Sequence, residues 1–119
     1  MRSSRENDPA RVRHIYDAVQ QCVRLTQGRT RADMDTDDLF ALAMARLLEI
    51  IGEAASQVTV EFRAAHPEIP WRAMIGMRNI VIHAYFEVDR DVIWQTISED
   101  IPPLEPLLAV LLTDIKGNA

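Results

Sequence analysis

Apolar residues recur along the chain at intervals of three and four, a pattern that predicts a series of amphipathic helices. Asp8-Pro9 is typical of a helix start, with Asp8 as the cap and proline at the first helical position. The first helix should run from about residue 9 to 27 and end at Gly28. Its buried face should consist of Val12, Ile15, Val19, Cys22 and Val23.

The polar segment 29–35 should be a loop, and Thr36-Asp37-Asp38 then supplies a cap and an acidic first turn. The second helix should begin there and end near residue 64. Small residues at 52, 54 and 55 should let another helix approach it closely. Its buried stripe is predicted to be Leu39, Ala43, Leu47, Ile50, Ile51, Ala54 and Val58.

Two prolines in the segment 66–70 interrupt the helical pattern, because proline lacks an N–H and restricts the residue before it. Pro70 can then start a third helix that runs from Trp71 to about Tyr85. Trp71 should fill the core, as should Trp94, unless Trp94 lies in a dimer interface.

Asp89 is a suitable cap for a short fourth helix, and Ile101-Pro102-Pro103 opens a last helix that should end near Ile115. The apolar residues of the fourth helix are Val92, Ile93, Trp94 and Ile97. No alternating segment predicts a strand. We therefore expect an all-α, up-and-down bundle of four to five helices.

A length of 119 residues favours one domain over 1–119, with its core at about 9–115. No apolar run approaches the roughly 18 residues that a membrane span needs. The charged N-terminus is not followed by the apolar segment of a secretory signal. These features predict a soluble cytoplasmic protein.

Cys22 is the only cysteine, which excludes an internal disulfide and any multi-cysteine metal site. It should be a buried, inert thiol. His14, on the first helix, is expected to be solvated, and His66 to be a turn residue. The three histidines have no ligand spacing and the carboxylates form no paired motif, so we expect neither a metal nor a cofactor.

The net charge of −5 argues mildly against a nucleic-acid partner, but the charge is unevenly distributed. Residues 1–31 contain seven arginines and three acidic residues, whereas residues 32–119 contain six basic and fifteen acidic residues. The basic first helix is either a solvated face or a rim that contacts phosphates.

The third predicted helix has one polar half and one apolar half at about 100° per residue. The apolar half contains Ile80, Val81 and Ala84, and the polar half carries Arg78, Asn79, His83 and Tyr85. Arg78 and His83 lie roughly 7.5 Å apart along the helix axis, so both could reach one phosphate.

These residue types suit RNA cleavage, because RNA carries its own nucleophile in the ribose 2′-hydroxyl. Cleavage needs a base to take that proton and a cation to stabilise the phosphorane charge. Imidazole titrates near neutrality, and guanidinium can bind two phosphate oxygens at once. Asn79 could orient His83 or donate to the phosphate. Spacing alone leaves open that His83 is a packed or capping residue.

The segment 76–86 closely resembles the HepT-like branch of the HEPN superfamily. The resemblance extends to the segments 50–55, 69–72, 88–89, 92–94 and 100–102, and covers roughly residues 9 to 112. It is carried by the order of these segments around an Arg-x4-His pattern formed by Arg78 and His83.

The resemblance implies a HEPN-type homodimer in which two Arg-x4-His segments face each other across a cleft. It further implies a metal-independent endoribonuclease, the toxin of a toxin–antitoxin pair. Arg78 would bind the scissile phosphate, His83 would be general base or acid, and Asn79 occupies the polar position after the arginine. Tyr85 would be the target of nucleotide (AMP) transfer by the partner, a minimal nucleotidyltransferase. Glu53 either approaches the cleft or is simply exposed.

Two other interpretations remain open. The chain could be a non-catalytic helical interaction module that binds a nucleotidyltransferase partner and nucleotide or RNA. Alternatively, the activity could belong to the complex, with this chain as a substrate of adenylylation.

Overall fold

The computed structural model describes residues 7–87 and 89–117, with side chains throughout these ranges except at 81–87. The described ranges contain helices and turns and no strand, so the all-α class is confirmed. Four long helices form the frame: α1 (Asp8–Thr26), α3 (Asp38–Ser56), α5 (Trp71–Glu87) and α7 (Leu104–Gly117). Between them lie the shorter α2 (Asp33–Thr36), α4 (Val60–Ala65), α6 (Arg90–Gln95) and a π-helical segment, η2 (Thr96–Asp100).

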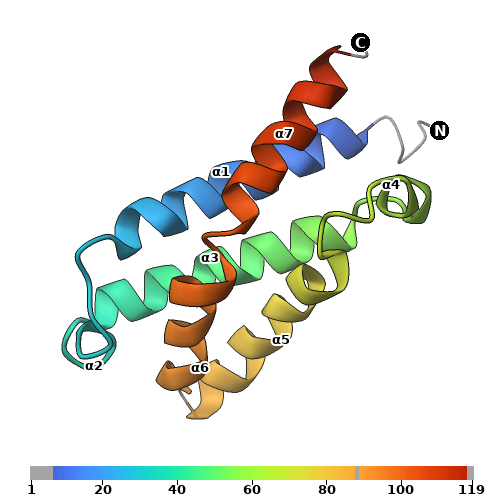
Figure 1. Cartoon of the computed structure of the whole chain (residues 1–119). Coiled ribbons are helices and arrows are strands. Elements are labelled where there is room, and N and C mark those ends of the chain that lie inside the picture. Colours follow the sequence, from blue (N-terminus) through green and yellow to red (C-terminus); the bar gives the residue numbers. More distant parts are fainter. Residues whose placement is uncertain (1–6, 88, 118–119) are drawn as a thin grey trace.

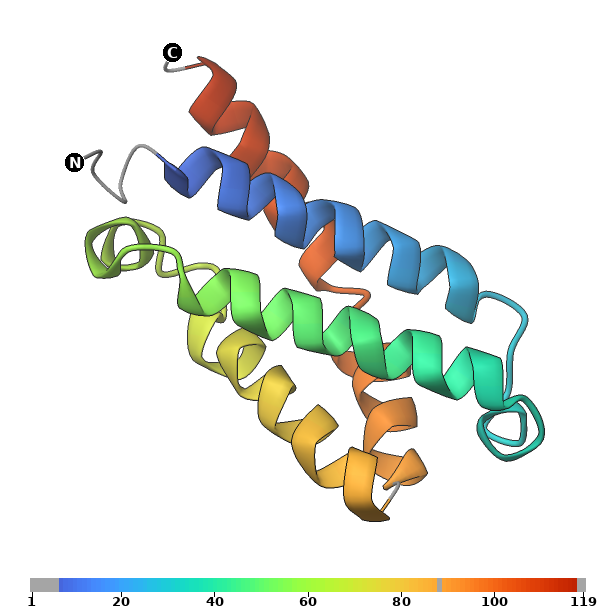
Figure 2. The same ribbon diagram turned by 180° about the vertical axis from the view of Figure 1, so that it is seen from behind.

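Helix α3 lies between α1 and α5 and packs against both (Figures 1 and 2). The chain turns back after α1 and again after α3, so α1 and α3 run in opposite directions, and α5 runs back along α3. Helix α6, η2 and α7 form the C-terminal part of the fold, and α7 packs against α1. No helix in the described ranges is both long and apolar enough to cross a membrane.

Helix starts follow the predicted caps at two places. The Asp37 carboxylate accepts a hydrogen bond of 3.1 Å from Phe40 N–H at the start of α3. This bond, together with one from Arg29, lowers the pKa of Asp37 below its usual value. Asp89 likewise accepts from Val92 N–H at the start of α6. Both caps satisfy backbone donors that the first helical turn leaves unpaired.

The predicted cap at Asp8 is wrong. Asn7 holds the cap position of α1, whereas Asp8 is fully buried and binds a distant part of the chain. Its carboxylate accepts hydrogen bonds from Thr59 N–H at 3.0 Å and from Thr59 Oγ1 at 2.6 Å. Aspartate before a proline often caps the helix that follows it, but the hydrogen-bond partner of this carboxylate is Thr59, far along the chain.

Two predicted boundaries also need correction. The segment 29–35, predicted as a loop, contains the start of α2. The second predicted helix does not reach residue 64, because α3 ends at Ser56 and Thr59 caps a separate helix, α4, by accepting from Phe62 N–H. Thr59 has the extended backbone of a cap residue, and this breaks the helix.

The buried stripe of α3 is rotated from its predicted position. Leu47, Ile51 and Val58 are buried as predicted, but Leu39 is 79% exposed and Ala43 is also exposed. The buried residues of α3 are Phe40, Ala41, Met44, Leu47, Leu48, Ile51, Gly52 and Ala55. The stripe is wide because α3 contacts α1 and α2 as well as α5 and α6.

Cys22 is buried as predicted, and its sulfur lies 3.9 Å from that of Met44. Burial raises the pKa of the Cys22 thiol to about 11. Since the thiolate is the reactive form, this cysteine is inert near neutral pH.

Candidate functional site

The orientation of α5 is set by its first half. Trp71 is buried and its indole N–H donates a hydrogen bond of 2.9 Å to the backbone oxygen of His66. Met74 and Met77 follow at helical spacing and are buried in the core. This leaves Arg78 half-buried at the edge of the core and Asn79 exposed.

Helices α3 and α5 approach each other closely at Gly52 and Arg78. A Cβ atom added at Gly52 would lie 2.7 Å from the backbone nitrogen of Arg78 and 2.9 Å from its Cβ. Only glycine fits this contact without displacement of the backbone. The prediction that small residues of this helix admit a neighbouring helix is confirmed at Gly52.

The residue after this glycine reaches the Arg78 side chain. Glu53 Oε2 lies 3.3 Å from Arg78 Nη1, and both side chains are partly exposed, Arg78 by 41% and Glu53 by 56%. The other carboxylate oxygen of Glu53 accepts a hydrogen bond of 3.2 Å from Gln57 Nε2, one helical turn further along α3. Glu53 is therefore exposed, as one of the two predicted alternatives has it, and it contacts Arg78. Its approach to a cleft between two protomers stays a prediction.

A shallow groove of about 240 Å³ lies between α3 and α1, and Glu53 is one of the residues that line it. Arg11 and His14 line it from α1, and Arg46, Glu49 and Gln57 are among the residues that line it from α3. Arg46 is already paired with Glu49, at 2.5 Å. His14 is exposed, as predicted.

Two further arginines of the basic N-terminal segment, Arg13 and Arg29, are engaged by carboxylates outside this groove. Arg13 pairs with Asp17, and Arg29 pairs with Asp37 while its guanidinium lies 4.6 Å from the centre of the Phe40 ring. In the described part of the segment, several arginines that could have bound phosphates are instead paired with carboxylates of the protein.

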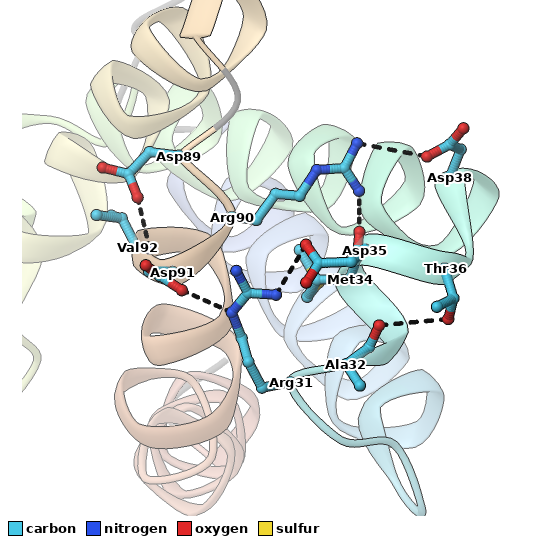
Figure 3. A network of polar contacts seen from close by, with 10 residues as sticks. All are labelled: Arg31, Ala32, Met34, Asp35, Thr36, Asp38, Asp89, Arg90, Asp91 and Val92. Carbon is cyan, nitrogen blue, oxygen red and sulfur yellow. Dashed lines mark hydrogen bonds and ion pairs between the residues drawn. The ribbon is translucent and has the colours of Figure 1, made fainter.

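Arg31 and Arg90 connect the start of α6 to α2 and α3 (Figure 3). Arg31 binds Asp91 at 2.7 Å and Asp35 at 3.1 Å. Arg90 donates to the backbone oxygen of Met34 and pairs with Asp38. Because α5 ends at Glu87 and α6 begins at Arg90, this network anchors the chain just beyond the C-terminal end of α5.

The four predicted site residues all lie on α5, which confirms that one helix carries them. Arg78 and Asn79 are described, whereas the side chains of His83 and Tyr85 fall outside the described residues. The convergence of Arg78 and His83 on one phosphate therefore stays a prediction. No group of three or more His, Cys, Asp or Glu side chains that could hold a metal ion occurs where side chains are described.

Sequence reasoning missed Gln57, Arg11 and Arg46 as neighbours of the site. A signal for Gln57 was present, since it lies four residues beyond Glu53 and helical neighbours at this spacing touch. Arg11 and Arg46 are brought together by the packing of α1 on α3, which no local pattern reveals.

The all-helical fold agrees with the class of protein that the sequence resembles. The family model described as "Ribonuclease HepT-like" matches residues 15–111, and the chain belongs to this family. No solved structure matches the chain at a significant level.

Two relatives illustrate the similarity. A protein of Thermococcus cleftensis named "Probable ribonuclease HepT" is 44% identical over 91 residues, which cover 76% of this chain and 83% of the relative. A protein of Caldanaerobacter subterraneus subsp. tengcongensis, named as a candidate RNase, is 37% identical over 103 residues, or 87% of this chain and 92% of the relative.

Proposed function

We propose that this protein is a metal-independent endoribonuclease whose site is centred on Arg78 and His83 of α5. The observation that carries the proposal is that the Arg78 guanidinium is half-exposed. It belongs to a chain of the HepT-like ribonuclease family. Guanidinium stays charged at all physiological pH values and can bind two phosphate oxygens through parallel hydrogen bonds.

In the proposed reaction, His83 takes the proton of the ribose 2′-hydroxyl, and the 2′-oxygen attacks the adjacent phosphorus. Arg78 stabilises the charge that develops on the phosphorane oxygens. The bond from phosphorus to the 5′-oxygen breaks, and that oxygen takes up a proton. The products are a 2′,3′-cyclic phosphate and a 5′-hydroxyl, and Asn79 supports the step by orienting His83 or donating to the phosphate.

We further propose that the site is completed in a homodimer, with α5 of each subunit beside the two-fold axis. Two copies would double the cations that face one RNA strand. This matters because the chain carries a net charge of −5 and several of its arginines are paired internally.

The proposed chemistry predicts cleavage that persists in EDTA. Purified, unmodified protein incubated with single-stranded RNA and EDTA should yield ends with a 2′,3′-cyclic phosphate or its 3′-phosphate hydrolysis product. The physical reason is that a general base and a guanidinium supply what a metal ion would otherwise supply. End-group analysis by mass spectrometry provides the measurement, and a strict magnesium requirement or 3′-hydroxyl ends would refute the mechanism.

The second candidate function is a non-catalytic module that binds a nucleotidyltransferase partner and nucleotide or RNA. The observation in its favour is that Arg78 is already paired with Glu53 in a protein that is acidic overall. The same incubation separates the two functions, because a module of this kind would bind without producing new RNA ends.

The biological setting that we propose is a toxin–antitoxin pair, in which a minimal nucleotidyltransferase silences this chain by transferring AMP to Tyr85. Each AMP adds a negative charge and a bulky nucleoside on the same helix as Arg78, which should obstruct an RNA phosphate. Co-expression with the cognate transferase should add one or more AMP masses to the peptide that contains Tyr85. Tyr85→Phe should stay unmodified and toxic.

The matched control is Tyr16→Phe, because Tyr16 is the other of the two tyrosines. It lies on α1, where its hydroxyl accepts a hydrogen bond from Gln20. This variant should be modified and silenced like the parent protein. If the partner silences Tyr85→Phe as well as the parent, inhibition works by binding and Tyr85 loses its role.

A further inference from the structure

The contact between Arg78 and Glu53 is built into the crossing of α3 and α5. Gly52 abuts the backbone of Arg78, and the next residue of α3, Glu53, pairs with the arginine side chain. Gln57 holds one carboxylate oxygen of Glu53, which leaves the other to face Arg78 Nη1 at 3.3 Å. The backbone packing and the hydrogen bond from Gln57 therefore place the Glu53 carboxylate beside the guanidinium.

This arrangement occupies only part of the guanidinium. The group carries five N–H donors in a planar fork, and Glu53 accepts from one of its nitrogens. Donors on the rest of the fork remain able to bind two oxygens of a phosphate. A long arginine side chain otherwise has to be ordered when substrate binds, and such ordering opposes both binding and the chemical step.

The charge of Glu53 has an opposite effect on affinity. A carboxylate beside Arg78 repels an incoming phosphate, so it lowers the attraction that the guanidinium exerts on RNA. Ordering of the Arg78 side chain favours RNA binding, whereas the repulsion between Glu53 and the phosphate opposes it. The two effects partly cancel in the affinity for RNA. In the chemical step the ordering effect should dominate, because catalysis depends on the position of the cation to within a fraction of an ångström.

We propose that Glu53 is a positioning residue for the ribonuclease reaction, which holds the Arg78 guanidinium in place for the phosphorane. This inference rests on the proposed function of Arg78. Glu53 acts through Arg78 and does not itself touch the RNA. A surface ion pair of this kind adds little to folding stability, so its loss should affect catalysis and not the fold.

The test compares Glu53→Gln with Glu49→Gln. Glu49 lies one helical turn earlier on α3, has a similar side-chain exposure of 48%, and pairs with Arg46 instead of Arg78. Glu53→Gln should lower kcat about tenfold and change KM for a single-stranded RNA by less than about threefold, since it loosens the cation without removing it. Glu49→Gln should leave both constants at the parent values.

A second measurement does not depend on activity. Order parameters of the arginine Nε–H groups, obtained from ¹⁵N relaxation, report motion on the picosecond to nanosecond timescale. The order parameter of Arg78 should fall in Glu53→Gln and stay at its parent value in Glu49→Gln. In an Arg78→Ala background, adding Glu53→Gln should cause no further loss of kcat, because residues that act as a unit are not additive.

The outcomes separate the two proposals. If Arg78→Ala cleaves RNA like the parent, or if the parent does not cleave RNA, the proposed function fails, whatever the order parameters show. If Arg78→Ala is inactive but Glu53→Gln keeps the parent kcat, Arg78 is catalytic and the role assigned to Glu53 is wrong. An Arg78 order parameter that is unchanged in Glu53→Gln would equally overturn the positioning role.

Discussion

Replacing either Arg78 or His83 with alanine should lower the rate of RNA cleavage at least about a hundredfold while the fold is retained. Loss of a general base costs about 10²- to 10⁴-fold in rate, and loss of a group that stabilises transition-state charge costs about 10²- to 10³-fold. Rates of cleavage of a labelled RNA by each purified variant provide the measurement. In cells, both variants should lose the growth inhibition expected of the parent protein.

The structure indicates why Arg78→Ala should fold normally. Its side chain is 41% exposed, and its ion pair with Glu53 is partly solvated, so little stability depends on it. The melting temperature should change by only a few degrees.

Arg72→Ala is the matched control, because Arg72 is an exposed arginine in the first turn of the same helix. It should cleave RNA like the parent, and sedimentation should show all three variants and the parent as dimers. If Arg78→Ala or His83→Ala unfolds, that residue is structural and its catalytic assignment is withdrawn. An active, strictly monomeric parent would exclude the composite dimeric site.

Local signals in the sequence predicted the elements that local chemistry determines. Pro70 starts α5, Asp37 and Asp89 cap α3 and α6, and Gly28, at a φ of +75°, follows the end of α1. Each of these residues acts on its own backbone or on that of a residue three positions away. Such effects depend on residue type and spacing alone, so a sequence without a structure is sufficient to find them.

Two of the errors concern residues whose partners lie far along the chain. Asp8 looked like a local cap but binds Thr59, fifty-one positions away. Leu39 and Phe40 could each start an apolar stripe, and only the packing of α3 among four neighbouring elements decides that Phe40 is the buried one. A helical wheel shows which residues share a face of a helix, but it does not show which other helices pack against that face.

For the candidate site too, some features followed from local sequence signals and others only from the fold. The wheel correctly placed Asn79 on the exposed side of α5, whereas Arg78 lies half-buried at the edge of the buried face, beside Gly52. The sequence did indicate Gly52 as a point of close approach. That α5 is the helix at Gly52, and that Glu53 therefore meets Arg78, followed only from the fold. The roles of His83 and Tyr85 come from the resemblance and remain predictions.

Gly52→Ala should reduce both the stability and the activity of the protein. Alanine normally stabilises a helix interior by about 1 kcal/mol relative to glycine. Here its Cβ would lie 2.7 Å from the Arg78 nitrogen, a backbone atom that cannot rotate away, so α3 and α5 must separate. Overpacking of this kind costs about 1–3 kcal/mol, which exceeds the gain in helix propensity. Thermal unfolding should therefore show a lower melting temperature.

The activity should fall further than the stability, because the displaced residue is Arg78 itself. A misplacement near 1 Å can cost about 10²-fold in rate, so kcat should drop strongly at temperatures where the variant is still folded. Gly76→Ala is the control: Gly76 lies inside α5, two residues before Arg78, and a Cβ there would meet nothing within 4 Å. This variant should gain about 1 kcal/mol of stability and keep the parent activity. If Gly52→Ala is instead stabilised as much as Gly76→Ala, the close contact between α3 and α5 does not determine the position of Arg78.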